Sequence, residues 1–100
     1  MNATKLHQDS IIIDGLICSK WCRELFEDMS KGGLTAANCT ISFWENFQNT
    51  VNNVVEMNQL IDASSDLLVK VHTTEDIRRA KREGKTGVIM GFQNAYAYED

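Results

Sequence analysis

The 100-residue chain contains no proline, and it shows no internal repeat, low-complexity tract or linker-like stretch. Nothing in it therefore marks a boundary between two domains. Domains usually run to roughly 100–150 residues, so a chain of this length holds one hydrophobic core at most. We expect residues 1–100 to lie within a single domain.

Long apolar runs and an excess of positive charge are also missing. No stretch approaches the roughly 18 apolar residues that a membrane span needs, and the first ten residues lack the basic and apolar regions of a secretory signal. The net charge is −4. Non-specific nucleic-acid binding depends on clustered Lys and Arg, so the sequence predicts no nucleic-acid partner and no membrane span.

Cysteine is scarce and odd in number, with Cys18, Cys22 and Cys39. Three thiols cannot all pair within one chain, which favours a reduced, cytoplasmic location. The spacing of Cys18 and Cys22, without a second pair, is only a weak metal signal. Packed thiols are the favoured interpretation, and Cys18 as a metal ligand or reactive thiol is the alternative.

The apolar residues that are present alternate between two periods. Ser10–Asp14 reads as a strand buried on both faces, and a helical stripe from Trp21 to Met29 follows and ends at Gly32-Gly33. Leu34–Ser42 reads as a second, central strand. This order is typical of parallel sheets flanked by helices.

The second half repeats the alternation. Ser42-x-x-Glu45 has the spacing of a capping box, and the helix that it predicts continues to about Ala63, with Phe47, Val51, Val54, Val55 and Ile61 on its apolar stripe. A short strand is expected over Leu67–Val71. Thr73-x-x-Asp76 predicts a third helix that stops at Gly84, and Gly87–Phe92 is the last strand. The predicted class is therefore α/β.

In α/β proteins the ligand lies beyond the carboxyl ends of the strands, so the residues after each strand are the informative ones. The three strand ends are 14–18, 40–44 and 91–95. Asp14, Gln93 and Asn94 are candidate substrate-binding residues there. A turn-forming role is the open alternative for each of the three.

Several segments resemble one known family. Residues 11–15, 31–36, 74–80 and 84–91 are similar to the N-terminal part of membrane (renal) dipeptidases, and the resemblance covers nearly the whole chain. It implies the N-terminal portion of a TIM (β/α)8 barrel domain that hydrolyses dipeptides with two zinc ions. Residues 1–100 would then be an incomplete part of that domain.

The sequence departs from this family where its metal ligands stand. The family's first strand ends in Asp-Gly-His-Asn-Asp and a later strand ends in Gly-x-Glu-Gly-Gly, whereas here Leu16 takes the His position, Cys18 the Asp position and Gln93 the Glu position. Only a deprotonated cysteine among these could bind zinc well. Cys18 is thus the one metal-ligand candidate, and a standard two-zinc site is not expected.

The resemblance implies a dipeptidase-like metallohydrolase that cleaves a small peptide or amide with metal-activated water, and that pairs as a homodimer. The alternative is a barrel homologue without peptidase activity that serves as a small-molecule binding or catabolic accessory protein. A free-standing module of three or four parallel strands is less favoured because it would leave sheet edges unpaired.

Overall fold

The chain alternates helices and strands along its whole described length. The structure is a computed structural model that describes residues 2–93. Its elements are α1 (Ala3–Asp9), β1 (Ile13–Ile17), α2 (Arg23–Lys31), β2 (Ala36–Ser42), α3 (Phe47–Ala63), β3 (Leu68–Lys70), α4 (Thr74–Glu83) and β4 (Thr86–Phe92). From β1 onward this is the order of elements expected from the sequence.

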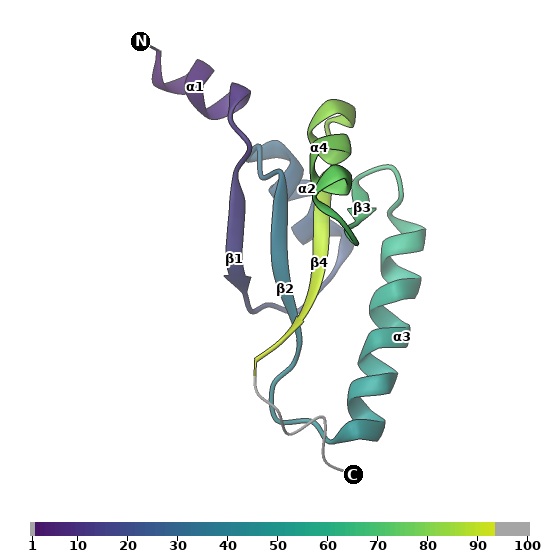
Figure 1. The fold of residues 1–100 in the computed structure, drawn as a ribbon. Coiled ribbons are helices and arrows are strands. Elements are labelled where there is room, and N and C mark those ends of the chain that lie inside the picture. Colours follow the sequence, from purple (N-terminus) through teal and green to yellow (C-terminus); the bar gives the residue numbers. More distant parts are fainter. Residues whose placement is uncertain (1, 94–100) are drawn as a thin grey trace.

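The four strands form one parallel sheet in the order β1-β2-β4-β3. β2 and β4 lie side by side in the centre, paired from Ala36 with Gly87 to Ser42 with Phe92 (Figure 1). β3 pairs only with Thr86–Val88, at the beginning of β4. The fold is α/β as predicted, and β1, β2 and β4 are arranged like successive strands of a partial TIM barrel.

One face of the sheet carries the hydrophobic core. Phe26 and Met29 of α2 and Met57 and Ile61 of α3 pack there with strand residues Ala37, Cys39, Ile41, Leu68 and Val88. Ala37 and Cys39 are small and fully buried. Their small volume allows the helices to approach β2 closely, which is how parallel strands bury apolar surface.

Helix α4 begins and ends as the sequence predicts. Thr73 Oγ1 accepts from the Asp76 backbone N–H and the Asp76 carboxylate accepts from Thr73 N–H, which completes the capping box. Gly84 then takes a left-handed conformation (φ 68°), which glycine adopts without a Cβ penalty. This confirms both predicted helix signals.

The first strand differs from the prediction. It covers Ile13–Ile17 instead of Ser10–Asp14, and most of it is exposed rather than buried on both faces. The side chain of Ile13 is 51% exposed. Because β1 is an edge strand, its only strand neighbour among the described residues is β2. A run of isoleucines predicts that the segment is buried, but it does not show whether the strand lies in the centre of the sheet or at its edge.

The predicted capping box of the long helix is wrong. Asn46 caps α3 by accepting from Asn49 N–H, while the Ser42 hydroxyl bonds to Thr50 Oγ1 and Glu45 accepts from Phe43 N–H. The buried residues of α3 are Thr50, Met57 and Ile61. Phe47, Val51 and Val55, which were predicted to lie on its apolar stripe, are exposed.

The N-terminal helix α1 was not predicted. It is short, has no buried residue, and lies away from the sheet beyond the start of β1 (Figure 1). His7 Nε2 lies 2.6 Å from the carbonyl of Gly32, which ties the helix to the end of α2. Among residues 2–93, no helix combines the length and apolar character needed to cross a membrane.

Candidate functional site

The carboxyl ends of β1, β2 and β4 bring three polar side chains together. Cys18 follows β1, Thr40 lies near the end of β2, and Gln93 follows β4. The Cys18 thiol donates to Gln93 Oε1 with a sulfur–oxygen distance of 3.4 Å, and it lies 3.9 Å from Thr40 Oγ1. We call Cys18, Thr40 and Gln93 the strand-end cluster.

Backbone pairing holds Gln93 in this position. Its N–H donates to the carbonyl of Ser42 at 2.9 Å, which extends the β2–β4 ladder by one residue beyond Phe92. Ser42 is fully buried, and its hydroxyl lies 2.9 Å from Thr50 Oγ1 on α3. The Gln93 side chain therefore projects from a position whose backbone is bonded to the end of β2.

The other predicted site residues are placed differently. Asp14 Oδ1 accepts from the Leu16 backbone N–H at 3.0 Å, a local turn-type bond. Leu16 itself is 53% exposed. This is the kind of bond expected of Asp14 as a turn-forming residue. Asn94 lies outside the described residues.

Asn38 and Gly91 lie on the sheet face opposite the core, next to the strand-end cluster. The buried Asn38 Oδ1 has no hydrogen-bond partner among residues 2–93. A Cβ added to Gly91 would lie 2.0 Å from this oxygen. The Asn38 amide therefore occupies the space above Gly91, and this face of the sheet is polar directly beneath the cluster.

The strand-end cluster consists of a thiol, a hydroxyl and a carboxamide, none of which carries a fixed charge.

Cys39 lies on the core face, and there burial, with a smaller contribution from Asp14, raises the pKa of its thiol to about 12. Cys39 is thus an inert core residue, whereas Cys18 is exposed.

A zinc site is not assembled by these residues. No group of three or more His, Cys, Asp or Glu side chains that could hold a metal occurs among the described residues. Gln93 Oε1 is engaged by the Cys18 thiol, and a neutral amide is a poor bridging ligand between cations. The cluster does not fit the two-zinc centre that the resemblance implies.

Sequence reasoning did not select Thr40 as a site residue. Thr40 lies within the second predicted strand end, and this position could have marked it as a site residue. A threonine in a buried strand, however, is more often a packing residue. The register of β1 against β2, which pairs Ile17 with Cys39, places the Thr40 hydroxyl beside Cys18.

The geometry described above is that of a parallel α/β segment with a polar cluster at its carboxyl edge. No family model matches the chain, and no curated protein matches it. Its structure is similar to that of an amidohydrolase from Pseudomonas aeruginosa, with 63% sequence identity and a TM-score of 0.97 over the whole of this chain. The chain spans 31% of the length of that structure. This likeness supports an amidohydrolase-like family for the chain, and it does not single out the membrane dipeptidases.

Proposed function

We propose that the protein is a hydrolase of small amides, with dipeptides as the leading substrate class, and that residues 1–100 supply part of one barrel domain. The observation that carries the proposal is the strand-end cluster, which stands where (β/α) barrels bind substrate. The amidohydrolase likeness supports the reaction class. The dipeptide assignment rests on the family resemblance alone.

The cluster supports binding of a substrate oxygen. Gln93 Oε1 accepts from the Cys18 thiol, and its Nε2 group makes no hydrogen bond to another residue among 2–93, so this group can donate to a ligand. The carbonyl of a scissile amide, or the terminal carboxylate of a dipeptide, accepts such hydrogen bonds. Gln93 then orients the substrate and Cys18 positions Gln93, without either one acting as nucleophile or base.

Zinc enters this proposal only as a cofactor implied by the resemblance, and its ligands are not found among the described residues. Bound metal would polarise the amide carbonyl and activate water. Metal analysis of the full-length protein tests this. The homodimer and the cytoplasmic location are also proposals, which light scattering and cell fractionation test.

The test measures hydrolysis of a panel of dipeptides and simple amides by the full-length protein. We expect turnover, and we expect Gln93→Ala to raise KM about tenfold or more, because one substrate hydrogen bond is lost. Gln59→Ala, on the exposed side of α3, is the matched control. An unchanged KM in Gln93→Ala would contradict the role of the cluster even if turnover is present.

The second candidate is a binding or catabolic accessory protein without peptidase activity. The observation that favours it is the presence of Leu16, Cys18 and Gln93 at the positions where the dipeptidase family has His, Asp and Glu. It predicts saturable binding of small amides with no turnover and no stoichiometric metal. Either result would replace the hydrolase proposal.

A further inference from the structure

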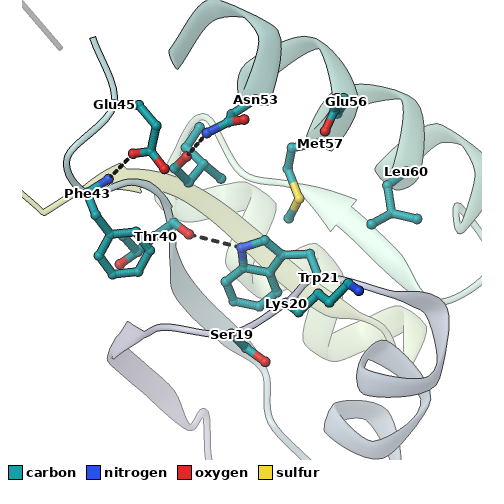
Figure 2. Close-up of a pocket in the computed structure, with 11 residues that line it drawn as sticks. Ser19, Lys20, Trp21, Thr40, Phe43, Glu45, Asn53, Glu56, Met57 and Leu60 are labelled. Carbon is teal, nitrogen blue, oxygen red and sulfur yellow. Dashed lines mark hydrogen bonds between the residues drawn. The ribbon is translucent and has the colours of Figure 1, made fainter. Parts of the chain in front are cut away.

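A cavity of about 350 Å³ lies near the carboxyl end of β2, between the loop before α2 and helix α3 (Figure 2). It is separate from the strand-end cluster. Its apolar lining comes from Trp21, Ile41, Phe43, Met57 and Leu60. Ligand pockets usually measure roughly 300–1,000 Å³, so this one suits a small metabolite rather than a nucleotide.

The floor of the cavity is held in place by hydrogen bonds. The Trp21 indole N–H donates to the carbonyl of Thr40 at 2.9 Å, and its ring stacks on Phe26 with centroids 6.4 Å apart. Asn53 Nδ2 donates to the carbonyl of Ile41 at 2.9 Å. The indole N–H and one N–H of the Asn53 amide are thus bonded to protein, and Asn53 Oδ1 accepts no hydrogen bond from the part of the chain that the structure describes.

The polar groups around this floor carry both signs of charge. Glu45 and Glu56 line the cavity from the β2–α3 loop and from α3, and Lys20 lines it from the opposite side, next to Trp21 (Figure 2). The Phe43 backbone N–H donates to Glu45 at 2.6 Å, and this bond holds the pKa of the Glu45 carboxyl below its usual value. The lining of the cavity therefore combines two carboxylates and one ammonium group with apolar side chains.

We propose that this cavity binds a free α-amino acid with an apolar side chain. The ligand's ammonium group would lie on the side of Glu45, Asn53 and Glu56, and its carboxylate would lie toward Lys20. Its side chain would rest on Trp21 and Met57. A cation alone would meet Lys20, and an anion alone would meet two carboxylates, so the charges of the cavity complement a zwitterion.

This inference is independent of the strand-end cluster and of the proposed hydrolysis, because it rests on different side chains. The experiment is calorimetric titration of the full-length protein with L-leucine, L-leucinamide and N-acetyl-L-leucine. Leucinamide lacks the carboxylate and the acetylated form lacks the ammonium group. We expect saturable binding of leucine and weaker binding of both analogues.

Two variants assign the charges. Glu56→Gln should weaken leucine binding about tenfold, and Lys20→Met should do the same, as expected for loss of one charged hydrogen bond. Lys20→Met should leave leucinamide binding unchanged. Glu24→Gln, which removes an exposed carboxylate of α2 away from the cavity, is the matched control. Thermal melts of the four proteins establish that each variant is folded.

Several results would overturn the proposal. One is the absence of saturable leucine binding, and another is leucine affinity that is unchanged in either Glu56→Gln or Lys20→Met. Equal affinity for leucine and both analogues would show that the cavity does not recognise the ammonium and carboxylate groups of the ligand. None of these results would bear on the amide hydrolysis measured with Gln93→Ala, so the two proposals can fail separately.

Discussion

A side chain at Gly91 would require Asn38 to move, because a Cβ there would meet Asn38 Oδ1 at 2.0 Å and Cγ at 3.0 Å. We expect Gly91→Ala to destabilise the fold by about 1–3 kcal/mol, the usual cost of overpacking. Gly15→Ala is the control, because nothing lies within 4 Å of its added Cβ. Urea denaturation measures both.

The double variant Asn38→Ala/Gly91→Ala identifies the cause. If the clash with the amide is responsible, the two substitutions will be non-additive, and the double variant will lose less stability than the sum of the single ones. Additive losses would show that Asn38 is not the obstacle.

We expect Cys18 and Cys39 to differ in reactivity because their burial differs. Cys18 is exposed, and Cys39 is buried with a pKa of about 12. Iodoacetamide at pH 8 should label Cys18 within minutes and Cys39 only after unfolding, as read from peptide masses. Because the folded state holds the Cys39 proton more tightly than the unfolded chain does, its contribution to stability is complete below about pH 9 and falls as the pH rises further. Labelling of Cys39 in the native protein would contradict this placement.

Arg23 at the start of α2 forms a forked pair with Asp66, in the turn after α3. Its Nη1 and Nη2 lie 2.9 and 2.6 Å from the two carboxylate oxygens. This bond holds the pKa of Asp66 below its usual value, so its stabilising effect is present above the ordinary pKa of Asp and is lost as the pH falls. Asp66→Asn should lower the melting temperature slightly at pH 7, and less in high salt. An equal loss at pH 7 and below the folded pKa would contradict it.

At the scale of the elements, the cap of α4 is the clearest target. Thr73→Ala should cost about 1 kcal/mol, because it removes the hydroxyl that accepts the Asp76 N–H. Thr74→Ala, one residue later, changes an exposed side chain outside the cap and is the matched control. Equal stability of the two variants would show that the capping box contributes little.

The elements also show what could be read from the sequence. Thr73, Asp76 and Gly84 determine α4 through bonds within a few residues, so a local pattern predicts it. Ser42 and Glu45 have the same spacing, yet tertiary contacts use them elsewhere, since the Ser42 hydroxyl is taken by Thr50. The cluster of Cys18 with Gln93 joins residues 75 apart in sequence. Reasoning from strand ends placed them at one edge, but only the three-dimensional register shows that they are bonded and that Thr40 joins them.

At the scale of the whole molecule, four large apolar side chains in or next to the sheet are exposed: Ile11 before β1, Ile13 and Leu16 in β1, and Phe92 at the end of β4. We expect the 100-residue chain, produced alone, to associate reversibly with increasing concentration and to bind a hydrophobic dye. Analytical ultracentrifugation measures this. A monodisperse monomer that unfolds cooperatively would favour the free-standing module.

The direct pairing of β2 with β4 has a consequence for how this protein can vary in length. The strand that carries Thr40 and the strand that Gln93 follows are neighbours, although α3, β3 and α4 separate them along the chain. β3 pairs only with the first residues of β4. The segment between β2 and β4 can become longer or shorter at its turns, near Ser65 or His72, without changing the distance between the two strand ends. Homologous chains should therefore accumulate insertions and deletions there and keep the number of residues in both central strands constant.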